Sequence, residues 1–256
     1  MIIKNALIYT ENHRFEKKDV RIRNERITEI AENGQFTDPD ENVIDGEGLY
    51  AIPGLVDIHF HGAVGHDFCQ ASKEELLKIA EYEAANGVLA ICPATMSYNE
   101  EILGKVMDKA ADYNEESGAD LVGINMEGPF IDLKKAGAQN PEYIMPADKE
   151  MFLRLQERSG GLIKLVDIAP EEKGAMDFIE QCHEQVKISI AHTCCNYETA
   201  CEALEKGVSH MTHLYNAMPG INHSSTGGGS RGRTDCRRHP YPPGNSENDI
   251  PNFRCR

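Results

Sequence analysis

Two histidines and a glutamate stand where apolar runs of the sequence end, and their side chains could bind a metal ion. In VDIHFHG, His59 and His61 are two residues apart, so on a strand both imidazoles point to the same face. Glu127 in NMEGPF follows an apolar run, where a carboxylate is costly to bury unless it is paired or metal-bound. The HxH pattern alone is equally consistent with structural or surface histidines.

Two further histidines close later apolar runs and strengthen the metal interpretation. His192 ends ISIAHT, and His213 lies in HMTHLYNAM. Neutral imidazole is the commonest metal ligand in proteins, so ligand-type residues at four strand ends favour a divalent metal site. His210 lies in the same run as His213. By alternation we expect it to point away from a face that Met211 and His213 share, and we interpret it as a packing residue.

The elements that must position these residues alternate between short apolar runs and amphipathic helical segments after Pro53. Six such β-α units in a row suit a doubly wound sheet or a (β/α)₈ barrel without its end. No GxGxxG follows the first strand, so a dinucleotide fold has no positive support. Because the candidate residues all stand at carboxyl ends of strands, we predict an α/β fold of the barrel type, incomplete in this chain.

The chain divides into three predicted regions. Residues 1–52 contain short β-prone runs separated by Gly, Asn and Asp turns, which predicts a small β structure. Residues 53–222 contain the six predicted β/α units. Residues 223–256 are rich in Gly, Pro and Arg, and we expect them to be a disordered tail.

The composition excludes several classes of partner. Asp and Glu number 42 against 26 Lys and Arg, giving a net charge of −16, which disfavours nucleic acid and anionic membrane surfaces. No apolar run is long enough to span a bilayer, and the first residues lack a signal-peptide pattern. The eight cysteines show no small-scaffold spacing. We therefore expect a cytoplasmic protein with no nucleic-acid or membrane partner.

Five motifs, HFHG, MEGPF, GAQNP, AHT and THLYNAMPG, occur in an order and spacing that resembles the N-acetylglucosamine-6-phosphate deacetylases of the amidohydrolase superfamily. The resemblance extends to Gly220 and implies a metal-dependent (β/α)₈ barrel with a small β-sandwich built from both chain ends. Residues 1–52 would be the N-terminal part of that sandwich. The full-length form is expected to be a homodimer.

The resemblance also assigns site residues. It implies that Glu127, His192 and His213 are metal ligands, and that His59 and His61 are the additional pair of members with two metals. One or two divalent ions are expected, with zinc or iron first. Gln139, Asn216 and Ala217 match positions that line the sugar pocket.

The implied reaction is hydrolysis of the N-acetyl group of N-acetylglucosamine 6-phosphate, by metal-activated hydroxide, to glucosamine 6-phosphate and acetate. A divalent cation lowers the pKa of bound water to about 7 and polarises the amide carbonyl. The general acid/base of the family is an aspartate of the eighth strand, which lies beyond the end of this chain. No catalytic residue is therefore assigned, and we expect the chain as written to be inactive. A dihydroorotase-like enzyme and a non-catalytic metal-binding remnant remain the alternatives.

The tail suggests a change of reading frame near His223. From Arg231 onward the chain contains six Arg and no Lys, unlike the Lys-rich part before it. One choice of synonymous codons for the tail, read one nucleotide later, gives Arg-Pro-Gly-Val-Val and then Asp-Gly-Ile-His. This resembles the continuation of the family, so a frameshift is the prediction.

Overall fold

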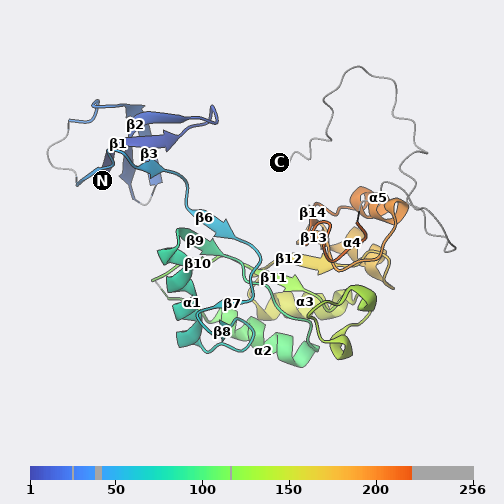
Figure 1. The fold of residues 1–256 in the computed structure, drawn as a ribbon. Coiled ribbons are helices and arrows are strands. Elements are labelled where there is room, and N and C mark those ends of the chain that lie inside the picture. The colour runs from blue at the N-terminus through green and yellow to red at the C-terminus, as the bar shows by residue number, and fades with distance from the viewer. Residues whose placement is uncertain (25, 38–41, 116, 221–256) are drawn as a thin grey trace, which may run out of the picture.

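The structure, a computed structural model, describes residues 1–24, 26–37, 42–115 and 117–220. The predicted frameshift near His223, the tail 223–256 and the last two residues of the predicted barrel segment lie outside these ranges. The described chain contains a mostly antiparallel sheet near the N-terminus, followed by a larger part in which parallel strands alternate with helices (Figure 1).

The N-terminal sheet lies within residues 1–52. Its strands are β1 (Ile2–Tyr9), β2 (Phe15–Arg23), β3 (Arg26–Glu32), β4 (Val43–Asp45) and β5 (Tyr50–Ala51). The order is β3-β2-β1-β4, with β5 also paired to β1; β1, β2 and β3 are antiparallel, and β4 and β5 run parallel to β1. Completion of this sheet to a sandwich stays a prediction.

The larger part consists of parallel strands in sequence order. The strands are β6 (Leu55–Asp57), β9 (Val88–Ile91), β10 (Asp120–Leu121), β11 (Ile124–Glu127), β12 (Ile163–Ile168), β13 (Lys187–Ile190) and β14 (His210–Met211). They form two sheets, β10-β9-β6 and β11-β12-β13-β14, and a bridge between Ala94 and Asn125 connects the two. Residues 120–127 thus contain two short strands, β10 and β11, and not one continuous strand.

Helices separate the strands along the chain. They are α1 (Lys73–Ala85), α2 (Glu100–Ala111), α3 (Lys149–Arg158), α4 (Ala175–Cys182) and α5 (Tyr197–Glu205). Smaller elements are the hairpin β7 (Gly62–Ala63) and β8 (His66–Asp67) and the 3-10 turns η1 (Leu133–Lys135) and η2 (Pro141–Tyr143). Ser72 is the N-cap of α1: its side chain accepts a hydrogen bond from the backbone N–H of Glu75, whose side chain accepts one from the backbone N–H of Ser72. In the described ranges, no helix is both long and apolar enough to span a membrane.

Alternation along the strands separates an apolar face from a polar one. Val166 and Ile168 of β12 pack into the main core, together with Phe152 of α3 and Phe178 of α4. Asp167 lies between the two apolar residues and is fully buried. Because neighbouring residues of a strand point to opposite faces, the helices cover the apolar face, and the polar residues line the other.

The last described strand, β14, differs from the prediction made for His210. Met211 packs against the main core, whereas the Thr212 hydroxyl reaches Ser189 and Asp167 on the polar face. His210 lines the same cavity as Thr212, so the expectation that it points away from the site face is wrong. The apolar Met211 takes the helix-facing position, and His213 reaches the polar face because its backbone turns into the left-handed region, with φ 54°.

Candidate metal centre

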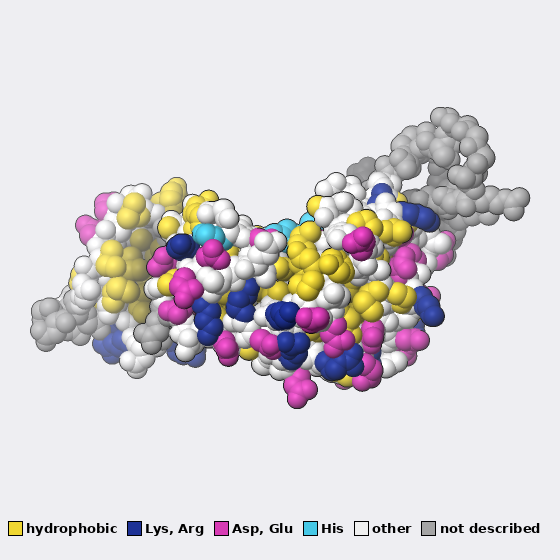
Figure 2. All heavy atoms as spheres, turned by 90° about the horizontal axis from the view of Figure 1, so that it is seen from below, with side chains coloured by type: hydrophobic (Ala, Val, Ile, Leu, Met, Phe, Trp, Pro, Cys, Tyr) yellow, Lys and Arg dark blue, Asp and Glu magenta, His cyan; other side chains and the backbone are white. Residues whose placement is uncertain are grey.

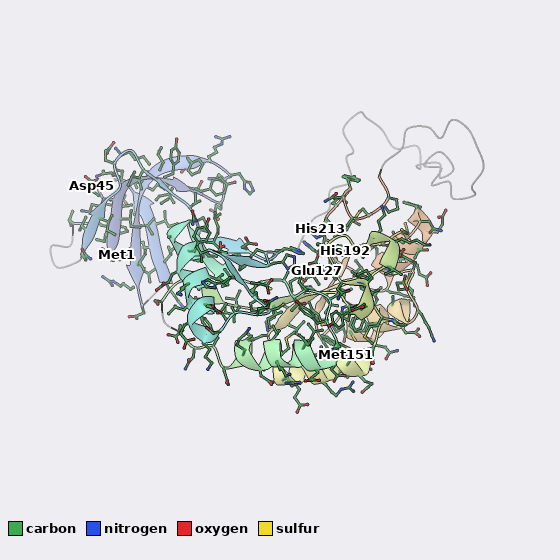
Figure 3. All side chains as sticks on the ribbon, turned by 60° about the horizontal axis from the view of Figure 1, so that its bottom comes forward. Met1, Asp45, Glu127, Met151, His192 and His213 are labelled. Atoms are coloured by element: carbon green, nitrogen blue, oxygen red, sulfur yellow. The ribbon has the colours of Figure 1, made fainter. Side chains whose placement is uncertain are left out.

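Four histidines converge on one buried carboxylate, Glu127, which is 1% exposed. Its Oε1 lies 2.8 Å from Nε2 of His192 and 2.9 Å from Nε2 of His213. On the other side, Nε2 of His61 lies 3.0 Å from Oε2, and Nε2 of His59 lies 3.5 Å from Oε1. Figure 3 shows Glu127, His192 and His213 together, and Figure 2 shows histidine side chains in the hollow at the middle of the molecule.

The parallel strands account for this convergence. Glu127 is the last residue of β11, His192 follows β13 by two residues, and His213 follows β14 by two. His59 and His61 follow β6. Carboxyl ends of neighbouring parallel strands meet at one edge, so five residues far apart in the sequence share one site. His192 and His213 both have left-handed backbone, with φ 45° and 54°. Such strain in non-glycine residues clusters at functional sites.

Backbone carbonyls orient two of the imidazoles. Nδ1 of His192 donates to the carbonyl of Lys135 at 2.7 Å, and Nδ1 of His61 donates to the carbonyl of Ala94 at 3.3 Å. A carbonyl only accepts, so Nδ1 carries the hydrogen in both rings, and Nε2 faces Glu127. Carbonyl partners of this kind typically fix the tautomer of a metal-binding histidine.

The charges of the cluster follow from the same contacts. Burial opposes ionisation of Glu127, but hydrogen bonds from His192 and His61 outweigh it and hold its pKa below the usual range. The hydrogen bond to Glu127 raises the pKa of His61, and the pKa of His192 is raised in spite of its burial. Burial lowers the pKa of His59. The carboxylate of Glu127 is therefore ionised. A cation that binds to the cluster would displace the protons of the histidines.

The donor set fits a divalent ion. His59, His61 and Glu127 form one triad, and Glu127, His192 and His213 form a second, each with donor atoms within 4.8 Å of one another. Nε2 of His59 is buried and has no hydrogen-bond partner among the described residues. Imidazole nitrogen and carboxylate oxygen suit zinc, iron, manganese or cobalt. The structure thus brings together all five predicted ligands; that they bind metal stays a prediction.

A buried polar network supports the site from beneath. Thr212 Oγ1 donates to Oδ1 of Asp167 at 2.7 Å and lies 2.8 Å from the Ser189 hydroxyl. Nδ2 of Asn125 lies 3.0 Å from Nδ1 of His59. Burial raises the pKa of Asp167 to about 7. Sequence reasoning missed these residues, although a carboxylate between apolar residues in IKLVDI is the signal that could have found Asp167.

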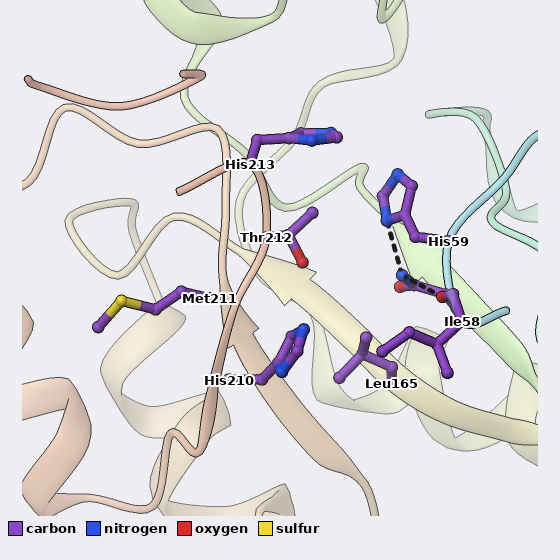
Figure 4. Close-up of a pocket in the computed structure, with 8 residues that line it drawn as sticks. Ile58, His59, Leu165, His210, Met211, Thr212 and His213 are labelled. Atoms are coloured by element: carbon purple, nitrogen blue, oxygen red, sulfur yellow. Dashed lines mark hydrogen bonds between the residues drawn. The ribbon is translucent and has the colours of Figure 1, made fainter. Parts of the chain in front are cut away.

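A cavity of about 310 Å³ lies next to this network. Its lining residues are Ile58, His59, Asn125, Leu165, His210, Met211, Thr212 and His213. Figure 4 shows His210 and Thr212 on the side that faces Ile58 and Leu165, while the Met211 side chain extends the other way. The cavity therefore opens on the candidate centre from the polar face of the sheet.

The predicted sugar-pocket residues lie in different surroundings. The backbone N–H of Asn216 donates to the carbonyl of His213 at 2.8 Å, and the carbonyl of Ala217 accepts from the backbone of Thr193 at 3.1 Å. Both therefore lie beside candidate ligands. Gln139 is 4% exposed, and its Oε1 accepts from the backbone of Ser97 at 2.5 Å. A role of the three in sugar binding stays a prediction.

A second group of metal-capable residues, Asp132, Glu171 and Cys194, lies near the loop after His192. Glu171 accepts from the Thr193 hydroxyl at 2.5 Å and from the backbone N–H of Cys194. Burial raises the pKa of Cys194 to about 11, so a thiolate ligand is disfavoured at neutral pH. The hydrogen bonds of Glu171 therefore give this group a structural role, which is to hold the loop that follows His192.

Comparisons with known proteins agree with the fold. The chain is 33% identical over 233 residues to an N-acetylglucosamine-6-phosphate deacetylase of Bacillus subtilis (strain 168), covering 89% of this chain and 59% of that protein. It is 30% identical over 230 residues to the one of Lysinibacillus sphaericus, with the same coverage. A crystal structure of the enzyme from Mycobacterium smegmatis superposes with a TM-score of 0.78 at 24% identity, over 87% of this chain and 58% of that one. No family model matches the chain.

In its fold the chain matches the solved structure of the Mycobacterium smegmatis enzyme, and in this chain histidines and a glutamate stand at the carboxyl ends of the parallel strands. Over most of its length the chain is similar in sequence to N-acetylglucosamine-6-phosphate deacetylases, and it spans 59% of the length of the two bacterial relatives.

Proposed function

We propose that the protein to which this chain belongs hydrolyses the N-acetyl group of N-acetylglucosamine 6-phosphate, giving glucosamine 6-phosphate and acetate. The observation that carries the proposal is the convergence of four histidines on Glu127 in a chain 33% identical to a named deacetylase. A divalent ion, when bound, supplies polarisation of the amide carbonyl and a lowered pKa of water.

The residues of this chain have distinct tasks in the proposal. Glu127, His192 and His213 would hold one ion, and His59 and His61 with Glu127 would hold a second. The carbonyls of Lys135 and Ala94 keep Nδ1 of their histidines protonated, so that each Nε2 stays directed at Glu127. The HxH pair supports two ions over one, and the nitrogen and oxygen donors support zinc or iron.

The proposal extends to the barrel, the sandwich, the sugar pocket and the assembly of the full-length protein. The strands β6, β9, β10–β11, β12, β13 and β14 would be the first six of a (β/α)₈ barrel spanning residues 53–222, and residues 1–52 would be part of a β-sandwich. Asn216, Ala217 and Gln139 would line the sugar pocket. A homodimer in the cytoplasm is proposed for the full-length form, and the six free cysteines of the described ranges are consistent with a reducing compartment.

A chimera tests the function. Residues 1–220 of this chain are joined to the remaining C-terminal part of the Bacillus subtilis relative, and acetate release from N-acetylglucosamine 6-phosphate is measured. We expect release by the chimera, and a loss of at least about 100-fold on Glu127→Gln, since even residues behind the ligands are worth 10–100-fold. A folded, metal-loaded chimera that releases no acetate would overturn the proposal. Release only from N-acetylgalactosamine 6-phosphate would reassign the substrate.

A further inference from the structure

His59 differs from the other histidines of the centre in the partner of its Nδ1. His61 and His192 face backbone carbonyls, which accept a hydrogen bond. Nδ1 of His59 faces the side-chain amide of Asn125 instead, at 3.0 Å from Nδ2 (dashed in Figure 4). An amide nitrogen donates, so the consequence for the ring is the opposite one.

A second contact fixes the orientation of this amide. Nδ2 of Asn125 also lies 3.3 Å from the carbonyl oxygen of Ile58. Turning the amide over would place its oxygen against that carbonyl, and two acceptors repel. In the observed orientation Oδ1 is buried without a hydrogen-bond partner among the described residues, so the amide acts here as a donor alone.

The tautomer of His59 follows from this orientation. A ring nitrogen that accepts a hydrogen bond carries no hydrogen, so the hydrogen of the neutral imidazole is on Nε2. Nε2 is the nitrogen that faces Glu127, at 3.5 Å from Oε1. A nitrogen that carries a hydrogen has no lone pair to give to a metal, so His59 must change tautomer before Nε2 can bind one.

We propose that Asn125 is a positioning residue that holds His59 in the Nε2–H tautomer, and thereby weakens the His59–His61–Glu127 half of the centre for a metal ion. In the Glu127–His192–His213 half, the carbonyl of Lys135 holds His192 in the tautomer whose Nε2 can bind a metal. The inference rests on the proposed metal site. Through Asn125, the two halves would differ in their affinity for a metal ion.

The first test needs neither metal nor activity. In the metal-free 256-residue chain, labelled with ¹⁵N-histidine, the ring nitrogens of His59 are observed at about pH 8, above the usual imidazole pKa. We expect Nδ1 to resonate as an unprotonated nitrogen and Nε2 as a protonated one. The reverse pattern would overturn the inference while leaving the deacetylase proposal untouched.

The second test changes the amide. Asn125→Asp offers Nδ1 an acceptor, so we expect His59 to become Nδ1–H and the second zinc ion to bind about 10–100-fold more tightly, as measured by competition with a chelator. Asn125→Leu removes the donor without adding charge and is expected to tighten the second ion by less. Asn99→Asp, at the exposed cap of α2, controls for charge and should change neither readout. A second ion that weakens in both Asn125 variants would contradict the inference.

Discussion

The two halves of the candidate centre share Glu127 but differ in how firmly they are built. The half after β13 and β14 contacts Oε1 at 2.8 and 2.9 Å, whereas His59 of the other half stays at 3.5 Å from it. The side chains of His192 and His213 are 7% and 32% exposed, and those of His59 and His61 are 21% and 39% exposed. Left-handed backbone occurs at His192 and His213, so the protein maintains strain to form that half. From this difference we expect the His192–His213 half to bind the more tightly held of the two proposed ions.

Loss of the shared carboxylate should remove the difference between the halves and have the largest effect. In Glu127→Gln both triads lose their anionic donor, and the four histidines lose their charged partner. We expect binding of both ions to fall by at least about 100-fold in zinc titrations. Retention of one tightly bound ion would mean that one half is complete without Glu127.

Replacing one histidine in each half tests the comparison directly. His192→Asn is expected to weaken the first zinc ion by at least about tenfold, and His59→Asn is expected to leave the first ion within about threefold while the second is lost. Metal content after dialysis, measured by mass spectrometry, distinguishes the two. Equal losses of the first ion in both variants would show that the halves are equivalent.

The cluster also predicts a pH dependence for the stability of the metal-free chain. The raised pKa values of His61 and His192 give stability that is complete below the unfolded value of 6.5 and is lost as pH rises through the folded values. The lowered pKa of Glu127 gives stability that is present above 4.5 and is lost as pH falls through the folded value. Both contributions are therefore present between 4.5 and 6.5.

Thermal unfolding measured across this range checks the prediction. The native chain should show its maximum difference from Glu127→Gln between these two pH values, and the difference should shrink on the alkaline side. Excess zinc should stabilise the native chain more as pH rises, because ligands must lose protons to bind. If the difference in thermal stability between the native chain and Glu127→Gln did not change with pH, the titration of this cluster would not contribute to the stability of the chain.

The sequence predicts the ligands of this centre better than the residues that support them. His59, His61, Glu127, His192 and His213 could be selected because each closes an apolar run, and parallel strands bring such ends together. Asn125 lies two residues before Glu127 in the same strand, and a single sequence gives no comparable signal for it. Its role depends on the 3.0 Å contact with a ring on another strand, which only the assembled sheet provides.

His210 shows where pattern reasoning fails for a physical reason. Alternation assigned Met211 and His213 to one face, but the strand β14 ends at Met211, and the backbone of His213 turns into the left-handed region. Periodicity holds only while the chain is extended, so a ligand placed just beyond a strand end can lie on either face. The N-terminal runs likewise predicted strands but not their order. Alternation within one strand does not say which strands pair, so the order β3-β2-β1-β4, with β4 parallel to β1, could not be predicted from it.

The smallest predicted effect concerns the network beneath the centre. Thr212→Val removes the hydroxyl that donates to Asp167, and leaves a buried carboxyl with one partner fewer. Since an unsatisfied buried group costs about 1–3 kcal/mol, we expect unfolding in urea to show a loss of this size. Thr212→Ser keeps the hydroxyl and should lose less. Because Asp167 lies 3.9 Å from Nδ1 of His59, Thr212→Val should also disturb the second ion more than the first, if the two halves differ as inferred.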